Sequence, residues 1–303
     1  MSTSEAARIA GVRPDDVIRF DGNTPPEAPV YASADVIAAA LAEVQRYPHG
    51  GYPPLLDAIA EYAGVAPEQV VLGAGADDLI LLCARAYAGP RDVVRVAHEP
   101  TYPLFRIGAW IAGAEVGDDD RPVLTFACRP HNPTGLVHEL PQSRPLVVDE
   151  AYFEYAAETA VGLNGVLVIR TFSKAFGLAA ARVGYLLADA DTAAELRVRQ
   201  DPLPVASLSA ALALAAVRAG PPDVSQTIEE RERLGAALRE LGYDPYRSRA
   251  NFLYVPTPRA EELYDRLLRR GLVVRPFDAA LRITVHTRAA NERLLDALEQ
   301  ADG

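Results

Sequence analysis

Four short, valine-rich runs constrain the fold of this chain more than any other feature of its sequence. They have the length of strands and alternate little between apolar and polar residues. That pattern is typical of strands covered on both faces of a largely parallel sheet. The runs are Asp92–Ala97, Pro122–Ala127, Pro145–Val148 and Gly165–Ile169. The sequence therefore predicts an α/β fold with a mostly parallel central sheet.

Each of the four runs ends in a polar or glycine-containing cluster. The clusters are Glu99–Tyr102, His131–Gly135, Asp149–Tyr152 and Thr171–Lys174. In an open α/β sheet, ligands bind outside the carboxyl ends of the strands. We therefore expect these four clusters to converge on one site.

Helical patterns flank the runs, and a second pattern follows them. The predicted helices are 35–44, 55–63, 79–88 and a series from 191 to 241 that is broken near Pro202 and Gly220. Two further strands are expected, at 70–72 and, at the edge of the sheet, at 182–188. The final part alternates strand, helix, strand, strand, helix, over 251–255, 259–270, 272–275, 281–285 and 288–299.

These patterns predict two domains. Residues 25–240 would form the large domain, and residues 1–24 with 241–303 a small α+β domain. Residues 1–24 are expected to be an irregular arm, and the helix 229–241 to bridge the domains.

Charge and composition exclude several classes of protein. The net charge of −11 argues against nucleic acid or an anionic membrane as the main partner. No apolar run is long enough to span a bilayer, and the first twenty residues lack a signal-peptide core, which predicts a cytosolic protein. Cys83 and Cys128 fit no metal spacing, so both are expected to be buried thiols.

Lys174 is the only lysine among 30 basic residues. A base composition that favours arginine codons would remove most dispensable lysines. Arginine stays protonated, whereas a lysine amine can lose its proton and form a Schiff base. Chance survival of one surface lysine is the alternative. The residues around Lys174 favour a catalytic role.

A Schiff-base lysine that served pyridoxal phosphate would need an anion opposite the ring nitrogen and donors at the phenolic oxygen. Asp149 follows a buried strand, where a carboxylate is costly unless a cation pairs with it. Tyr152 and Asn132 are candidate donors to the phenolic oxygen. An aspartate that caps the next helix is the alternative for Asp149.

The cofactor's phosphate would need a group of hydrogen-bond donors. Such a group is predicted at the helix start Gly75-Ala76-Asp77, where free N–H groups and the helix dipole favour an anion. Further candidates are the hydroxyls of Thr171 and Ser173 and the guanidinium of Arg182. Tyr102 offers a ring for stacking, although a lone tyrosine there could also be ordinary packing.

Together these motifs resemble the class I/II aminotransferases of pyridoxal-phosphate fold type I. The resemblance is carried by Asn132-Pro133-Thr134-Gly135, Asp149-Glu150-Ala151-Tyr152, Thr171 to Leu178 and Arg182-Val183-Gly184-Tyr185. It extends from Asn23 to Arg282. Within that group, Arg46-Tyr47-Pro48 and Leu281-Arg282-Ile283-Thr284-Val285 look most like the histidinol-phosphate aminotransferases.

The resemblance implies a role for each candidate residue. Lys174 would bond to pyridoxal phosphate, and Asp149 would face the pyridine nitrogen. Tyr152 and Asn132 would bind the phenolic oxygen and Tyr102 the ring, and the phosphate would be bound by the residues named above. Arg282 would hold the acidic group of the substrate, with Arg275 as a second anion contact and Asn23 beside them. By the same resemblance, Tyr47 would reach the cofactor of the neighbouring subunit in a homodimer.

The chain also departs from the family. Segments 110–123 and 135–147 are shorter than usual, which predicts trimmed helices beside the sheet. Residues that differ from the common family choices are Thr24, His49, His131 and His286. A pyridoxal-phosphate decarboxylase of a phosphorylated amino acid could share every cofactor contact, and so could a non-catalytic scaffold.

Overall fold

The computed structural model describes residues 1–27, 29–48 and 51–302, so His49 lies outside the described residues. The chain divides into two compact units. One consists of Met1–Pro26, Pro133–Val137 and Asp223–Gly303, and the other of Glu27–Asn132 and His138–Pro222. In the described part of the chain, no helix is both long and apolar enough to cross a membrane.

The larger unit is built on a seven-stranded sheet with the order β2-β8-β7-β6-β5-β3-β4. All strands are parallel except β8, which runs antiparallel to β2 and β7. The strands are β2 (Val70–Gly73), β3 (Val93–Val96), β4 (Glu115–Val116), β5 (Leu124–Cys128), β6 (Leu146–Asp149), β7 (Val166–Thr171) and β8 (Gly184–Leu187). The predicted α/β class and the mostly parallel sheet are confirmed.

The predicted edge position of β8 is wrong. β8 lies inside the sheet, between β2 and β7, and β2 and β4 are the edge strands. All four residues of β8 are buried, so the backbone N–H and C=O groups on both of its sides need strand partners.

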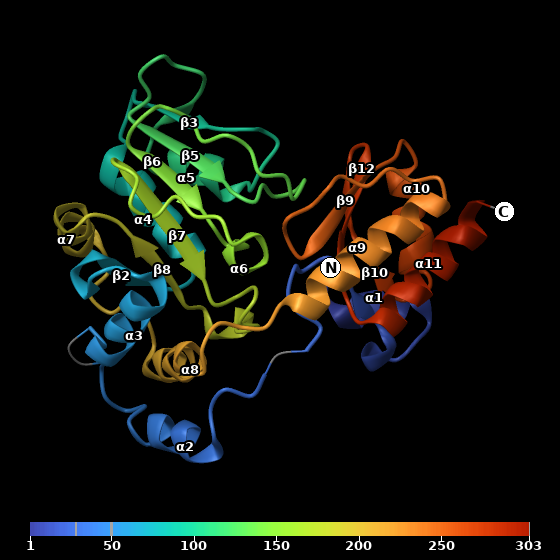
Figure 1. Cartoon of the computed structure of the whole chain (residues 1–303), viewed down its shortest axis with the longest axis horizontal. Helices are drawn as coiled ribbons and strands as arrows, with labels where there is room; N and C mark the ends of the chain where they lie inside the picture. Colours follow the sequence, from blue (N-terminus) through green and yellow to red (C-terminus); the bar gives the residue numbers. More distant parts are fainter. Residues whose placement is uncertain (28, 49–50, 303) are drawn as a thin grey trace. The chain divides into compact units, whose positions relative to one another are not determined.

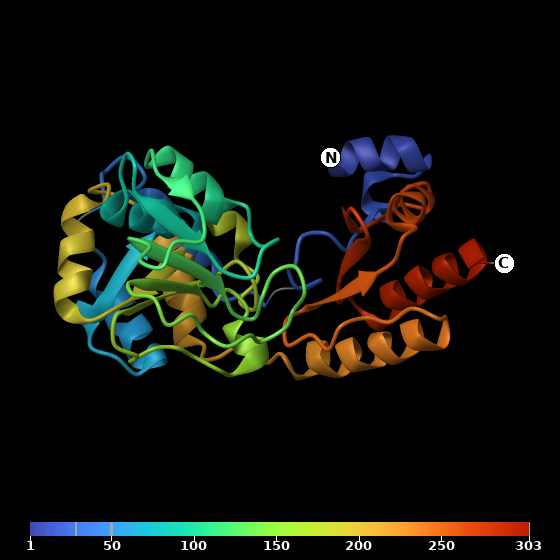
Figure 2. The same cartoon turned by 90° about the horizontal axis from the view of Figure 1, so that it is seen from above.

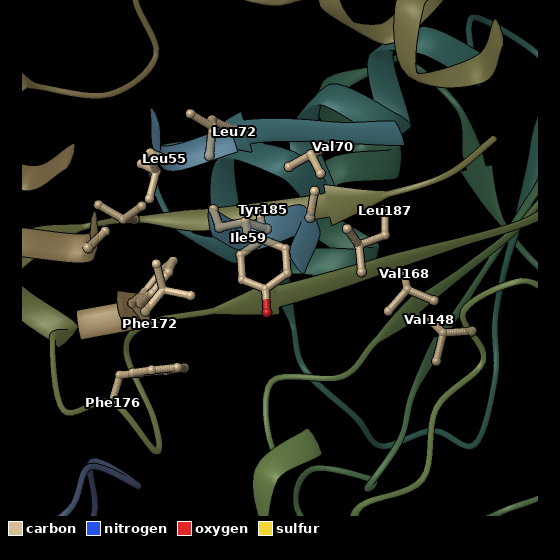
Figure 3. Packing of buried hydrophobic residues seen from close by; sticks show 14 of the residues in the cluster. Leu55, Ile59, Val70, Leu72, Val148, Val168, Phe172, Phe176, Tyr185 and Leu187 are labelled. Atoms are coloured by element: carbon tan, nitrogen blue, oxygen red, sulfur yellow. The ribbon is translucent and has the colours of Figure 1, made fainter. Parts of the chain in front are cut away.

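Helices cover both faces of this sheet, which gives three layers (Figure 1). On one face, Leu55 and Ile59 of α3 pack in one core with Val168 and Tyr185 (Figure 3). Ala213 of α8 belongs to the same core. On the other face, α4, α5 and α7 form a second core with the side chains of the alternate strand residues. The helices are α2 (Ala34–Ala42), α3 (Pro53–Ala63), α4 (Ala76–Tyr87), α5 (Leu104–Ile111), α6 (Phe153–Ala156), α7 (Ala190–Arg199) and α8 (Ser207–Arg218), with the 3₁₀ turns η2 (Pro67–Gln69) and η3 (Ala179–Ala181).

The turn from β2 into α4 positions part of the site. Gly75 has φ +88°, a value that favours glycine, and it directly precedes the first residue of α4. Asp77 and Asp78 lie in the first helical turn, where the helix dipole stabilises negative charge. The N-terminus of α4 therefore lies directly at the carboxyl end of a sheet strand.

The link between β5 and β6 contains no regular element in residues 129–145, all of which are described. Parallel strands are usually joined by a crossover that contains a helix. The absence of one here agrees with the trimming expected for residues 135–147. In the other shortened segment, residues 110–123, the structure has the two-residue strand β4.

The smaller unit holds a three-stranded antiparallel sheet of order β11-β12-β9 and a parallel pair, β1 and β10. Figure 2 shows α9 and α11 side by side, and α1 beside α10. The elements are α1 (Thr3–Ala10), η1 (Pro14–Asp16), β1 (Ile18–Arg19), α9 (Ser225–Glu240), β9 (Phe252–Pro256), α10 (Ala260–Leu268), β10 (Leu272–Val273), β11 (Arg275–Phe277), β12 (Ala280–Thr284) and α11 (Arg288–Asp302).

The expectation of an irregular arm over residues 1–24 is wrong. Ser2 caps the helix α1 by accepting a hydrogen bond from the N–H of Glu5, and Gly11 ends it with φ 68°. Only Ala6 and Ala7 of this helix are buried. So short an apolar stripe gives a weak periodic signal.

Candidate active site

Two neighbouring strands of the larger unit, β6 and β7, end at the residues that carry the predicted chemistry. β6 ends at Asp149, and Lys174 follows the end of β7 by three residues. The Nζ atom of Lys174 lies 5.8 Å from the centre of the Tyr152 ring. Asp149, Tyr152 and Lys174 therefore lie at the same end of the sheet, as predicted for the carboxyl ends of parallel strands.

Asp149 is a buried carboxylate with few hydrogen bonds. It is 4% exposed, and its Oδ1 accepts a hydrogen bond of 3.0 Å from the N–H of Ala151. The thiol of Cys128 lies 4.0 Å from its Oδ2. Burial raises the pKa of Asp149 to about 7, although Lys174 lowers it. A cation placed against this carboxylate would offset the free-energy cost of ionising it.

A network of donors surrounds the N-terminus of α4. The two carboxylate oxygens of Asp77 accept hydrogen bonds from the Tyr102 hydroxyl at 2.8 Å and from Arg182 Nη2 at 3.0 Å. Arg182 Nη1 also lies 3.4 Å from the hydroxyl oxygen of Ser173, which accepts a hydrogen bond from Thr171 at 3.0 Å. Burial and the bond to Asp77 raise the pKa of Tyr102, so its hydroxyl stays protonated.

Close backbone packing shapes this corner. A Cβ atom on Gly75 would lie 2.7 Å from Arg182 Nη2, and one on Gly184 would lie 2.9 Å from the backbone nitrogen of Ala76. Glycine at both positions therefore allows the start of α4 to lie close to the guanidinium of Arg182 and to β8. Such an arrangement of N–H groups and a guanidinium binds a phosphate well.

The other predicted cofactor residues of the larger unit lie in different places. Asn132 is half-buried beyond β5, and its carbonyl accepts a hydrogen bond of 3.0 Å from Thr101. Tyr152 is 2% exposed and directly precedes α6. Tyr47 is 80% exposed and lines a groove with residues of α2 and α8.

The predicted substrate residues belong to the smaller unit. Arg282 is 9% exposed and donates a hydrogen bond of 2.9 Å to the carbonyl of Asp21. Asn23 is 1% exposed, and its Oδ1 accepts a hydrogen bond of 3.0 Å from Thr284. Arg275 is exposed and pairs with Arg282 across the antiparallel strands β11 and β12.

Two residues next to the site escaped prediction. Glu150 and Arg170 form a buried ion pair with an N–O distance of 3.0 Å. An arginine inside the apolar run of β7 was the available signal, because a buried guanidinium requires an acidic partner. Cys128 was expected only as a packing residue, and its contact with Asp149 depends on the pairing of β5 with β6.

With this geometry established, comparisons with known proteins identify the family. Residues 16–118 and 117–298 match the aminotransferase class I and II family. The chain belongs to this family. It is 35% identical to the histidinol-phosphate aminotransferase of Thermoanaerobacter pseudethanolicus over 298 residues, covering 85% of each chain. It is 36% identical to histidinol-phosphate aminotransferase 2 of Pseudomonas fluorescens, covering 97% of this chain and 91% of the relative.

Solved structures agree with this assignment. Histidinol-phosphate aminotransferase from Sinorhizobium meliloti, solved in complex with pyridoxal-5'-phosphate, superposes with a TM-score of 0.85 at 25% identity, covering 99% of this chain and 94% of that one. An L-threonine-O-3-phosphate decarboxylase from Porphyromonas gingivalis superposes with a TM-score of 0.80, covering 94% of this chain and 99% of that one. At 18% identity it shows the shared fold alone.

The protein is therefore an aminotransferase of fold type I, and its cofactor is pyridoxal phosphate. Its substrates are an amino compound and a 2-oxo acid. The described residues fit this cofactor. A buried carboxylate of raised pKa suits a protonated ring nitrogen, and the glycine-lined start of α4 suits a phosphate.

Proposed function

We propose that this aminotransferase moves the amino group of histidinol phosphate to a 2-oxo acid. The observation that carries the proposal is the buried carboxylate of Asp149 at the end of β6, beside the strand that leads to Lys174. The choice of donor is supported by the relatives, which are histidinol-phosphate aminotransferases at 30–36% identity.

Each residue of the larger unit has a proposed task. Pyridoxal phosphate supplies a ring that absorbs the electrons released at the donor's Cα. Lys174 would hold the cofactor through its Nζ, and the same amine, once free, would move a proton from the donor's Cα. The ionised Asp149 would hold the proton on the ring nitrogen. Tyr152 and Asn132 would bind the phenolic oxygen, and Tyr102 would lie against the ring.

The phosphate of the cofactor is proposed to bind beside Gly75, at the N–H groups of Ala76 and Asp77, the hydroxyls of Thr171 and Ser173, and Arg182. The N–H of Gly75 itself donates a hydrogen bond of 2.8 Å to the carbonyl of Gly73. At present one oxygen of Asp77 accepts a hydrogen bond from Arg182 Nη2, and both side chains are nearly half exposed. An ion pair that is this exposed contributes little to stability. Exchanging it for a phosphate contact should therefore cost little.

Arg282 is proposed to bind the acidic group of the amino donor, with Asn23 and Arg275 assisting. The guanidinium of Arg282 is fixed by the carbonyl of Asp21 and lies 5.4 Å from the Phe252 ring centre. An arginine fixed in this way is suited to bind a carboxylate or a phosphate through two parallel hydrogen bonds.

We also propose that the active form is a homodimer in which Tyr47 serves the partner's site. The helix α2 has no buried residue. Val36 and Leu41 of this helix are exposed, and so are Val44 and Tyr47, which follow it. A groove of about 440 Å³ is lined by residues of α2, by Tyr47 and by Ser207 and Ala211 of α8. A second copy that covered this apolar surface would remove it from water.

A donor screen tests the substrate proposal. Loss of the visible band of the lysine-bound cofactor would be followed with histidinol phosphate, aromatic amino acids, aspartate and threonine phosphate, with 2-oxoglutarate as acceptor. The proposal expects turnover that is strongest with histidinol phosphate. A broad aromatic profile would refute the choice of donor. Release of carbon dioxide from threonine phosphate would instead support the decarboxylase.

Subunit mixing tests the role of Tyr47. Tyr47→Ala and Lys174→Ala subunits should each have little activity alone. Co-expressed, they should form hybrid dimers with one intact site, which regain up to about a quarter of the wild-type activity if subunits pair at random. No regain in dimers that are shown to be mixed would contradict the shared site.

A further inference from the structure

Glu150 and Arg170 form a buried ion pair close to Asp149 and Lys174 in the sequence: Glu150 follows Asp149, and Arg170 lies in β7, the strand that precedes Lys174. The side chains of Glu150 and Arg170 are 0% and 3% exposed. Both Nε and Nη2 of Arg170 donate hydrogen bonds of 3.0 Å to Oε2 of Glu150. None of the tasks proposed above uses either residue.

The pair lies on the face of the sheet opposite to Asp149. Successive strand residues point to opposite faces, and Glu150 continues β6 by donating its N–H to the carbonyl of Ile169 at 2.8 Å. Arg170 lies opposite Tyr185 in the β7–β8 ladder, so it shares the face occupied by Val148, Val168 and Tyr185 (Figure 3). Its partners are therefore separate from the cofactor-binding groups.

Further bonds extend the pair to the loop after α6. Thr159 accepts a hydrogen bond from Arg170 Nη2 at 2.9 Å and donates one to Glu150 Oε2 at 2.9 Å. The backbone N–H of Ala160 donates to Glu150 Oε1 at 2.6 Å. The guanidinium of Arg170 also stacks 3.5 Å from the centre of the Phe153 ring. One side chain thus connects β7 to the end of β6, to α6 and to the 159–160 loop.

Stability alone does not account for such a pair. Burying two charges costs desolvation free energy, and well-packed apolar side chains of similar volume often stabilise a core as well or better. Directional bonds, however, fix the relative position of the segments they join. Here one joined segment, the end of β6 and the start of α6, carries Asp149 and Tyr152. The other, the end of β7, leads to Lys174.

Arg170 also lies near a second carboxylate, that of the half-buried Glu154. This group accepts a hydrogen bond of 3.2 Å from the Tyr62 hydroxyl, and burial raises its pKa to about 7. A Glu150→Gln change therefore leaves Arg170 near another acidic group. Glu150→Gln and Arg170→Lys are the conservative variants with which to test the pair.

We propose that Glu150 and Arg170 are positioning residues that set the placement of Asp149 and Tyr152 relative to Lys174, and so tune the cofactor without touching it. The inference rests on the proposed roles of Asp149 and Lys174. It predicts that the pair governs the cofactor's protonation and kcat more than the fold.

The experiment uses holoenzyme carrying Glu150→Leu with Arg170→Met, and separately Arg170→Lys and Glu150→Gln. The pH titration of the visible band of the lysine-bound cofactor is recorded with kcat, KM and thermal stability. We expect folded variants whose titration midpoint moves by about half a pH unit or more. We also expect kcat to fall roughly 10- to 100-fold while KM changes much less.

Arg144→Met is the matched control. Arg144 joins the same two strands at their other end, where its Nε donates a hydrogen bond of 3.0 Å to the carbonyl of Asn164. It should leave the titration midpoint unchanged. If this control shifts the midpoint equally, the effect is general loosening of the strands and the proposal is overturned.

The proposal would also be overturned if folded Arg170→Lys or Glu150→Gln holoenzyme had the same titration midpoint as the wild type. Should the double variant not fold, these two conservative variants decide the outcome. Failure of the wild-type protein to form the lysine-bound band would instead refute the proposed function of Lys174. The two failures are thus distinguishable.

Discussion

The candidate site residues of the larger unit and those of the smaller unit differ in their charge and in their hydrogen-bond partners. At the end of β6, the carboxylates of Asp149 and Glu150 are buried, and burial raises the pKa of Asp149 to about 7. In the smaller unit, Arg282 donates a hydrogen bond to the carbonyl of Asp21, and the side chain of Asn23 accepts one from the hydroxyl of Thr284. The first arrangement is suited to moving protons, and the second to recognising an anion. Variants of the two units should therefore have separable effects.

The largest effect is expected at Lys174. Lys174→Ala should lower kcat by roughly 10⁴-fold or more, because it removes both the covalent attachment and the group that moves the proton. Lys174→Arg should be equally inactive, since a guanidinium stays protonated. Steady-state kinetics with the donor chosen by the screen measure this. Substantial activity in either variant would show that another residue performs the chemistry.

Asp149→Asn should have the next largest effect, about 10²- to 10³-fold on kcat. The amide cannot keep the ring nitrogen protonated, while the packing around it is nearly unchanged. Single-turnover kinetics of the half-reaction would isolate this step. A rise in KM with an unchanged kcat would instead mean that Asp149 contributes to binding and not to catalysis.

Arg282→Met should affect donor binding in the smaller unit without affecting cofactor binding in the larger one. We expect kcat/KM for the acidic donor to fall roughly 10- to 100-fold, the value of one charge-assisted contact, while cofactor binding stays at the wild-type level. Equilibrium dialysis of the cofactor, run beside the kinetics, separates the two. Arg282 would lose its assigned role if cofactor affinity fell in parallel with kcat/KM.

The smallest effect concerns the cofactor-free protein. Because the folded pKa of Asp149 is raised above its usual value, the stability from its protonated form is lost as pH rises through about 7. Between pH 6.5 and 8, the free energy of unfolding should fall by about 1 kcal/mol from this group. Glu154, with its pKa also raised to about 7 by burial, contributes with the same sign.

Thermal unfolding of the cofactor-free wild type, Asp149→Asn and Glu154→Gln at several pH values measures this effect. In each variant, the melting temperature should fall less steeply with rising pH than in the wild type. The range stays above pH 6.5 because burial lowers the pKa of His131 to about 4, which makes stability fall with acid. A slope unchanged in both variants would mean that neither carboxyl titrates in this range.

The parts of the fold set by local pattern were predictable from the sequence. The buried runs predicted strands β3, β5, β6 and β7, and their polar ends supplied the candidate site residues. The placement of β8 was not predictable, because its burial on both sides depends on partners distant in sequence. Helix α1 escaped because it buries only two small residues.

Within the site, residue types indicated the chemistry, but side-chain pairing needed the sheet register. Asp149 and Lys174 were identified as single residues after buried runs. The bonds of Glu150 to Arg170, and the contact of Cys128 with Asp149, arise because three parallel strands place these residues side by side. Residues far apart in sequence gave no local sign of those contacts.

Reductive trapping tests the central claim most directly. Wild-type protein loaded with pyridoxal phosphate would be reduced with borohydride, digested and analysed by mass spectrometry. The account predicts one modified peptide, which carries the phosphopyridoxyl group on Lys174, and its absence in Lys174→Ala. A cofactor trapped at the N-terminal amine alone, or an unmodified Lys174 in active enzyme, would contradict it.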